Sequence, residues 1–323
     1  LVSWNSLIGG YTELGRGHEA LNCFEQMQSE GLTPDGVTFT HILRACSCID
    51  AIEKGKQIHD EIVSRGLLIK NIVVGTALVD MYAKCGMLKK AQEVLDELPH
   101  RDIVSWNALI VGYIQEGQAQ QALNYFEWMQ TEGLTPDSVS FICALKACGS
   151  TGALNKGKQI HDDIVSRGFL KKDNLLGAAL VDMYAKCGLL DKAQKVLKEL
   201  PIQSIVSWNV LIGEYTQQGQ GHEALNCFEY MLSVLSEDIC IDVDTFICML
   251  KACGSVGAIS KGKQIHDEVV RRGLLQKDVM LATALIDMYC KCGMLEKAHV
   301  LLKQLQIRDE VSWSALIAGY AQQ

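Results

Sequence analysis

Three asparagines and three aspartates stand at regular places in this 323-residue sequence and carry hydrogen-bonding chemistry. An ionised carboxylate only accepts hydrogen bonds, whereas a carboxamide both donates and accepts them. The same residue types also favour helix N-caps and Pro-Asp turns, so a purely structural role is the alternative. The pairs are Asn5 with Asp35, Asn107 with Asp137, and Asn209 with Asp242.

No pattern in the sequence indicates catalysis, a cofactor or a metal site. His59, His161 and His266 each precede an aspartate, but adjacent residues do not share a helix face and so form no metal pair. The HEAL segments at His18 and His222 lack the second histidine of HExxH. A phosphate loop, a nucleophile elbow and the HxE…CxxC pattern of zinc deaminases are all missing from the sequence. We therefore expect no enzyme activity in this chain.

The thirteen cysteines mostly recur at fixed intervals, as do Cys46, Cys148 and Cys253. Disulfide scaffolds are typically short secreted chains, which does not fit this sequence. Two CxC segments lack the second ligand pair that a zinc site needs. We therefore interpret the cysteines as small residues that pack between helices in a reducing compartment.

The elements that hold these residues are repeated. The stretch VSWNSLIGGY at 2–11 returns with few changes, and its tryptophans are Trp4, Trp106, Trp208 and Trp313. They are separated by 102, 102 and 105 residues, and a fixed period indicates a repeat architecture. Each period contains three smaller units of about 35, 36 and 31 residues.

Every small unit carries two helical stripes. Trp4, Leu7, Ile8 and Tyr11 follow the i, i+3, i+4, i+7 spacing, and Gly15 interrupts the pattern before a second stripe. A single helix pair cannot bury its apolar face, so neighbouring pairs must stack. The sequence predicts an all-α fold, a right-handed α-solenoid superhelix of about 19 helices whose first helices line the inner face.

Composition limits the function classes. Hydrophobic residues make up 48% of the chain, and no apolar run approaches the 18–20 residues or so of a membrane span. The formal net charge of −8 is unfavourable for contact with phosphates, which normally supply much of nucleic-acid affinity. The sequence begins at Leu1 and stops partway through a fourth copy, so we expect a fragment of a longer chain.

The ordered motifs carry a family resemblance. VSWNxLIxGY…EAL…GLTPD is followed by LKAC…GKQIHD and then by ALVDMYAKCG…KAQ…VL…LP, three times over. This order resembles the pentatricopeptide repeat proteins of plants, and more narrowly their P-L-S subclass. The resemblance implies one continuous repeat array over 1–323, in which units of P type, L type and S type alternate. P-type units are 1–35, 103–137, 205–242 and the partial 310–323; L-type units are 36–71, 138–173 and 243–278; S-type units are 72–102, 174–204 and 279–309.

The resemblance assigns base recognition to the fifth and last residues of a unit, which read one RNA base per repeat. The implied base-specifying residues are Asn5, Asp35, Thr76, Asp102, Asn107, Asp137, Ala178, Ser204, Asn209, Asp242, Thr283 and Asp309. Uracil and guanine present an imino N–H that an aspartate can accept, and the family pairs Asn with pyrimidines and Thr with purines. The Asn/Asp units are thus expected to read U and the Thr/Asp units G, while Ala178 with Ser204 has no assignment.

Other positions are expected to assist. The family places the second residue of a unit against the base face, here Val2, Val73, Val104, Leu175, Val206 and Met280. Lys84, Lys186 and Lys291 end S-type first helices and are possible phosphate contacts, or simply lysines that suit a helix C-terminus. The L-type pairs Thr40/Asn71, Ile142/Asp173 and Ile247/Asp278 follow the family's pairing poorly. With RNA running 5′ to 3′ along the chain, the expected target is U-x-G-U-x-x-U-x-G.

The resemblance implies single-stranded RNA as partner and selection of a C-to-U editing site in a mitochondrial or chloroplast transcript. A deaminase domain in cis or in trans, with accessory factors, would then act on the bound RNA. The main alternative is a protein-binding scaffold that resembles tetratricopeptide repeats, which the uneven 35/36/31 alternation disfavours. We also expect an irregular turn at 232–242, where LSVLSEDICID departs from the earlier QTEGLTPD.

Overall fold

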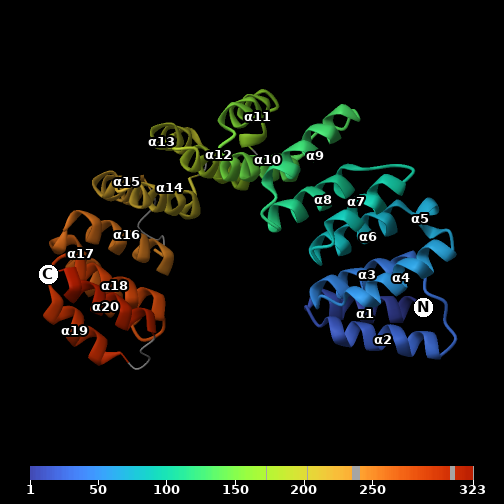
Figure 1. Ribbon diagram of the computed structural model, residues 1–323, viewed down its shortest axis with the longest axis horizontal. Helices are drawn as coiled ribbons and strands as arrows, with labels where there is room; N and C mark the ends of the chain where they lie inside the picture. Colours follow the sequence, from blue (N-terminus) through green and yellow to red (C-terminus); the bar gives the residue numbers. More distant parts are fainter. Residues whose placement is uncertain (172, 202, 235–240, 306–309, 323) are drawn as a thin grey trace. The chain divides into compact units, whose positions relative to one another are not determined.

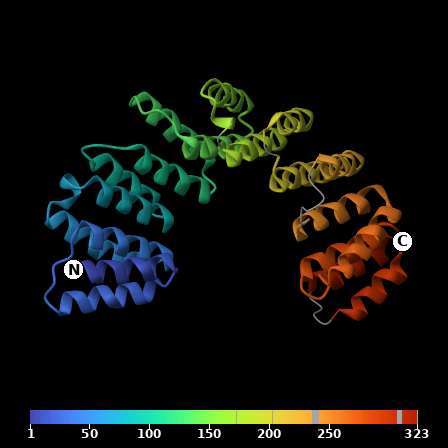
Figure 2. The same cartoon turned by 180° about the vertical axis from the view of Figure 1, so that it is seen from behind.

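A computed structural model describes residues 1–171, 173–201, 203–234, 241–305 and 310–322. Every regular element in these ranges is helical, and the succession of helix pairs can be followed in Figure 1 and from behind in Figure 2. The all-α solenoid class is therefore confirmed. Contacts divide the chain into two compact units, Leu1–Ile160 and His161–Gln323, and each stacks its own helix pairs.

The helix bounds follow the periodicity of the sequence. The first helices are α1 (Val2–Glu13), α3 (Gly36–Cys48), α6 (Ile72–Lys84), α8 (Ile103–Gln115), α10 (Ser138–Thr151), α12 (Asn174–Lys186), α14 (Ile205–Gln217), α16 (Val243–Val256), α18 (Val279–Lys291) and α20 (Glu310–Gln322). The second helices are α2 (Gly17–Ser29), α4 (Ile52–Ser64), α7 (Leu88–Glu97), α9 (Ala119–Thr131), α11 (Leu154–Ser166), α13 (Leu190–Glu199), α15 (Gly221–Val234), α17 (Ile259–Arg271) and α19 (Leu295–Gln304).

One element was not expected from the sequence. The short helix α5 (Leu67–Lys70) follows α4 and brings the described α-helices to twenty rather than about nineteen. A 3₁₀ turn, Phe169–Lys171, occupies the corresponding place after α11. Four residues are too few to show a helical period, which is why the sequence pattern did not reveal α5. Most of the turn expected at 232–242 lies outside the described residues.

Polar side chains and glycines set the helix ends. Asp35, Asp102, Asp137 and Asp242 each accept a hydrogen bond from the backbone N–H three residues later and so begin α3, α8, α10 and α16. Glycines with left-handed backbone close many helices, and Gly31, for example, has φ +78° after α2. A first helix therefore begins at the residue that follows the last residue of the preceding P- or S-type unit.

First helices stack directly on one another within each of the two compact units. In the compact unit Leu1–Ile160, α1 packs on α3, α3 on α6, α6 on α8 and α8 on α10. In the compact unit His161–Gln323, the first helices from α12 to α20 pack in the same succession. Second helices pack on the first helix of their own pair, as contacts show for α2, α4, α7, α9, α13, α15, α17 and α19. Trp106 and Trp208 are completely buried between these layers, whereas Trp313 in α20 is 44% exposed. No described helix is both long and apolar enough to cross a membrane.

Candidate nucleic-acid interface

The central P-type unit joins its fifth and last residues through one hydrogen-bonded cluster. Asn107 Nδ2 donates to Asp137 Oδ1 at 3.1 Å, and Asn107 Oδ1 accepts from Ser140 Oγ at 2.7 Å. Ser140 N donates to the same Asp137 oxygen at 2.8 Å. Asp137 is therefore a helix cap, as the structural alternative predicted, and at the same time the partner of Asn107.

The first and third P-type units repeat this cluster. Asn5 Nδ2 donates to Asp35 Oδ1 at 3.1 Å, while Thr38 Oγ1 donates to Asn5 Oδ1 at 2.6 Å. In the third unit the corresponding distances are 3.2 Å from Asn209 Nδ2 to Asp242 Oδ1 and 2.9 Å from Thr245 Oγ1 to Asn209 Oδ1. Three copies with the same geometry show that the first helix of one unit and the start of the next assemble the pair.

The carboxylate determines which way the amide points. An ionised aspartate cannot donate, so the asparagine must turn its NH2 group towards it and its oxygen towards the hydroxyl. Burial raises the pKa of Asp35 and of Asp242, but hydrogen bonds from Thr38 and Asn5, or from Thr245 and Asn209, outweigh it and hold each pKa below its ordinary value. Both carboxylates are therefore ionised at neutral pH.

The S-type units assemble their pairs more loosely. Thr76 Oγ1 lies 3.5 Å from Asp102 Oδ1, at the limit of a hydrogen bond. Thr283 Oγ1 lies 2.8 Å from Ser312 Oγ, and its expected partner Asp309 lies outside the described residues. Ser204 caps α14, and Ala178 has no polar group with which to meet it.

The L-type units form no such pair among the residues that the structure describes. Thr40 Oγ1 donates back to Gly36 O within its own helix at 2.8 Å. Asn71, Asp173 and Asp278 cap α6, α12 and α18 through backbone N–H groups. Ile142 and Ile247 offer no hydrogen bond, which agrees with the poor match of these units to the family pairing.

The second residues of the units are exposed although they are apolar. Val2, Val73, Val104, Leu175, Val206 and Met280 are 56–81% exposed. Val37 and Val139 in L-type units and Val311 in the last unit share this exposure, whereas the third L-type unit has Asp244 there. More than half of each side chain of the six expected base-flanking residues is therefore accessible to a ligand.

A hollow of about 360 Å³ opens beside the pair of the third P-type unit. Its lining includes Val206, Asn209 and Asp242, which are the second, fifth and last residues of that unit. Its other polar lining residues are Asp182 from the preceding S-type unit, Glu214 and Gln217 from α14, and Asp244 from the following L-type unit. An exposed apolar side chain, an amide and a carboxylate thus face one space.

The three lysines that end S-type first helices are paired with aspartates. Lys84 Nζ lies 2.8 Å from Asp80 Oδ2, and Lys186 and Lys291 repeat this contact with Asp182 at 2.9 Å and Asp287 at 2.8 Å. The lysine side chains remain 41–45% exposed. Each lysine charge is therefore accessible but neutralised by a neighbouring aspartate. The sequence analysis did not predict these ion pairs, although the four-residue spacing of Asp and Lys on one helix favours them.

Sequence comparisons place these features in a family. The PPR repeat family model matches residues 1–48, 101–150 and 203–255, and the PPR repeat model matches 76–103, 179–202 and 282–309. The chain belongs to the pentatricopeptide repeat family. Such repeats are helical binding modules rather than enzymes, and we assign this chain no catalytic activity.

Several pentatricopeptide repeat-containing proteins of Arabidopsis thaliana resemble the chain over nearly its whole length. At5g27110 is 34% identical over 99% of this chain, and the chloroplastic At1g11290 is 36% identical over 99%. The mitochondrial At3g09040 is 35% identical over 99%. The chain spans 31–45% of the length of these three relatives.

Solved structures of a pentatricopeptide repeat protein share the fold. Maize PPR10 superimposes with a TM-score of 0.70 and 18% identity, covering 99% of this chain and 51% of that one. PPR10 in complex with an 18-nt psaJ RNA element gives a TM-score of 0.72, again with 18% identity, and covers 99% of this chain and 53% of that one. The likeness confirms the solenoid of pentatricopeptide repeats.

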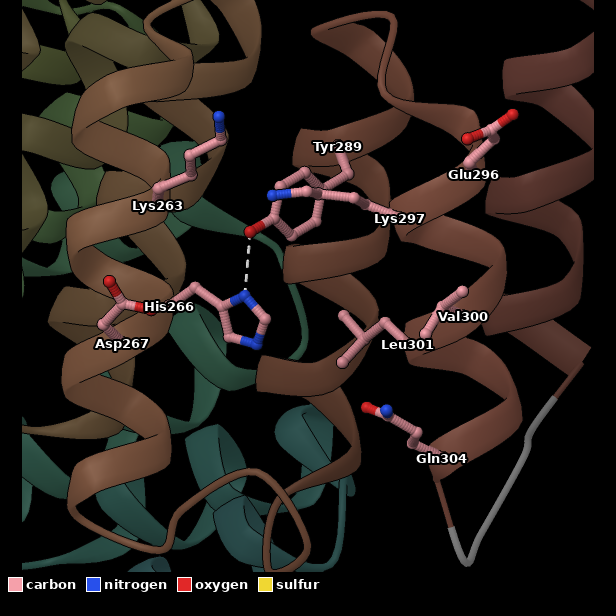
Figure 3. A pocket seen from close by; sticks show the side chains of 9 residues that line it. All are labelled: Lys263, His266, Asp267, Tyr289, Glu296, Lys297, Val300, Leu301 and Gln304. Carbon is pink, nitrogen blue, oxygen red and sulfur yellow. Dashed lines mark hydrogen bonds between the residues drawn. The ribbon is translucent and has the colours of Figure 1, made fainter.

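A different hollow, of about 540 Å³, lies between α17, α18 and α19 (Figure 3). His266 Nδ1 lies 2.8 Å from the Tyr289 hydroxyl, and His59 with Tyr82 and His161 with Tyr184 repeat this contact at 2.9 Å. Burial lowers the pKa of all three histidines, so they are neutral at pH 7. The QIHD histidines therefore join an L-type second helix to the next first helix.

The cysteines behave largely as small packing residues. Cys46, Cys143, Cys148, Cys227, Cys253 and Cys290 are buried, and none of the described cysteines forms a disulfide. Burial raises the pKa of the Cys46 thiol to about 12, which keeps it protonated. Cys48 is exposed and departs from this interpretation. The described residues contain no cluster of His, Cys, Asp or Glu suited to a metal ion.

Proposed function

We propose that this chain binds single-stranded RNA and reads one base in each P-type and S-type unit. The observation that carries the proposal is the hollow at the third P-type unit, where Val206, Asn209 and Asp242 face one space. The RNA complex of maize PPR10, which shares the fold, supports the same ligand class. The repeated Asn/Asp clusters favour this function over a protein-binding scaffold, because a protein partner does not require the same polar pair at intervals of 102–105 residues.

The hydrogen-bonding groups that the pair leaves unused match the edge of uracil. Among the described residues, the second N–H of Asn107 and Oδ2 of Asp137 have no hydrogen-bond partner. They offer a donor beside an acceptor, which complements the carbonyl oxygen and imino N–H of uracil. Guanine presents the same two groups on a larger ring, so space in the hollow must separate the two bases.

The apolar second residues complete the reading unit. An exposed aliphatic side chain such as Val104 gains by covering the flat face of a base, because this removes apolar surface from water. Neighbouring second residues such as Val104 and Val139 would then lie on opposite faces of one base. This arrangement supplies affinity without regard to sequence, while the Asn/Asp pair supplies the specificity.

We further propose that the chain selects a C-to-U editing site in a mitochondrial or chloroplast transcript. The P-L-S alternation of its units supports this assignment, and so do relatives whose names place them in these two organelles. The described residues hold no cluster of His, Cys, Asp or Glu suited to the zinc ion of a deaminase, so a deaminase domain in cis or in trans would perform the chemistry. We include editing accessory factors among the proposed partners of the chain.

Selection from a random single-stranded RNA pool tests the proposed function. We expect enrichment of U-x-G-U-x-x-U-x-G, with U opposite 1–35, 103–137 and 205–242 and G opposite 72–102 and 279–309. Counting enriched bases at each position measures the preference of each unit independently. A pool that shows no enrichment, under salt conditions where the protein still binds RNA, would contradict sequence-specific reading.

The paired lysines lead to a prediction about salt. Changing Asp80, Asp182 and Asp287 to Asn releases three lysines, so RNA binding should strengthen at low salt and its salt dependence should steepen. A phosphate contact adds about 0.7 to the log–log slope for single strands, so three new contacts add at most about 2. The slope is measured from dissociation constants across a series of salt concentrations.

A matched triple variant controls for overall charge. Asp60, Asp162 and Asp267 follow the QIHD histidines on second helices and can be changed to Asn with the same gain of three charges. We expect this variant to steepen the slope far less. Equal slopes for the two triple variants would show that only net charge matters and that the S-type lysines do not contact phosphates.

A further inference from the structure

A buried hydroxyl belongs to each P-type cluster although it lies in the following unit. Thr38, Ser140 and Thr245 are fully buried, and each contacts both members of a pair. Their hydroxyl oxygens lie 2.6, 2.7 and 2.9 Å from the asparagine Oδ1 and 2.9, 2.9 and 2.6 Å from the aspartate Oδ1, respectively. Both partners are acceptors and a hydroxyl has one hydrogen, so the hydroxyl bridges the amide and the carboxylate by sharing that hydrogen between them.

The first S-type unit and the three L-type units lack this bridge among the residues that the structure describes. Ser105 occupies the same position after the first S-type unit and is equally buried, but its hydroxyl donates to the backbone oxygen of Asp102 at 2.8 Å. After the L-type units the position is apolar, with Val74, Leu176 and Leu281. The bridge therefore occurs in all three units where Asn and Asp meet, and it is missing from the first S-type unit and from the L-type units.

We propose that this hydroxyl is a positioning residue for base recognition: it holds the asparagine amide so that its free N–H, and not its oxygen, faces the base. This inference rests on the proposed function of the Asn/Asp pair. The hydroxyl does not touch RNA. It acts through the amide, whose two ends are nearly equal in shape but opposite in hydrogen-bonding character.

The amide oxygen of Asn107 belongs to a buried side chain and accepts its hydrogen bond from Ser140. Asn107 is only 6% exposed, so its Oδ1 finds no water to replace Ser140 and would be left without a hydrogen bond. The amide oxygen then recovers a hydrogen bond if the amide rotates or shifts towards solvent. This movement changes the distance between the amide donor and the carboxylate acceptor that contact the base. The backbone N–H of Ser140 still caps α10 through Asp137 in such a variant, so the helix start is retained.

Ser140→Ala is the direct test, with Ser105→Ala as matched control. Both remove one fully buried hydroxyl at the third residue of a first helix whose aspartate cap accepts from that residue's backbone. Binding is measured to four RNAs that differ only opposite 103–137 and to four that differ only opposite 72–102. Thermal unfolding of both variants reports their structural costs.

We expect Ser140→Ala to reduce base discrimination opposite 103–137 by roughly 2- to 10-fold, the size expected for the net contribution of one hydrogen bond. Ser140→Thr should retain the wild-type discrimination, because Thr38 and Thr245 make the same bridge. Ser105→Ala should leave discrimination opposite both units unchanged. Thr38→Val, which keeps the side-chain shape, should repeat the loss opposite 1–35.

The outcomes separate this inference from the proposed function. Wild-type discrimination that survives in both Ser140→Ala and Thr38→Val overturns the role of the hydroxyl and leaves base reading by the pair intact. A loss of the same size in Ser105→Ala also overturns it, because the effect would then follow from burial alone. A wild-type chain with no base preference at any unit overturns the proposed function and this inference together.

Discussion

Asn107→Thr should shift the base preferred opposite 103–137 from uracil towards guanine. A base-edge contact is typically worth about 1–3 kcal/mol of discrimination, which corresponds to a change in preference of roughly 5- to 150-fold. Asp137 still accepts from the imino N–H that both bases share, while the shorter threonine leaves more room for a purine. The change therefore acts on one base position and not on overall affinity.

The structure contains precedents for the new pairing. Thr76 faces Asp102 in the first S-type unit, and Thr283 Oγ1 lies 2.8 Å from Ser312 Oγ in the third. In the Asn107→Thr variant, Ser140 can make the hydroxyl–hydroxyl contact that Ser312 makes with Thr283. The fold should accept the substitution, because each unit interacts mainly with its immediate neighbours.

Four RNAs that vary only opposite 103–137 provide the measurement for wild type and variant. Asn209→Thr, tested opposite 205–242, serves as a second instance in the unit that carries the hollow. Preferences at all other positions should remain as in the wild type. An identical base preference in the two proteins would return Asn107 and Asp137 to a purely capping and packing role.

The fold was predictable because its signals are local and repeated. The stripe of Trp4, Leu7, Ile8 and Tyr11 predicts a first helix, and the structure begins α1 at Val2. The Asn/Asp pairs could be found by comparing three copies of one unit. The bridging hydroxyls follow Asp35 and Asp137 in a D-x-x-[ST] pattern, but Asp102 and Ser105 share this pattern without forming the bridge, so the spacing alone does not identify them.

Other features depend on neighbours that sequence spacing does not specify. Lys84 and Asp80 lie four residues apart, yet only the structure shows that the lysine bends back to its own helix and does not extend outwards. The same sequence context VSW surrounds Trp106 and Trp313, yet Trp106 is completely buried against Tyr125 and Trp128 of α9, whereas Trp313 is 44% exposed. Burial in a solenoid is set by the adjacent pair.

Replacing these two tryptophans should therefore have very different effects on stability. Trp106→Ala should lower the free energy of unfolding by about 3–5 kcal/mol, the range measured for removal of a fully buried large aromatic side chain. The indole is 5.6 Å from the ring of Trp128 and 6.2 Å from that of Tyr125, so several second-helix contacts disappear together. Trp313→Ala, at the same place in its unit but 44% exposed, should cost less than about 1 kcal/mol.

Trp106→Phe distinguishes loss of packing from loss of the indole N–H. Trp106 Nε1 is buried without a hydrogen-bond partner, so phenylalanine removes an unsatisfied donor along with part of the ring. We expect its cost to lie well below that of Trp106→Ala. Urea unfolding followed by far-ultraviolet circular dichroism measures all three variants without relying on tryptophan fluorescence. If Trp106→Ala and Trp313→Ala proved equally destabilising, the stack of helix pairs around α8 and α9 would not be the source of stability that their burial indicates.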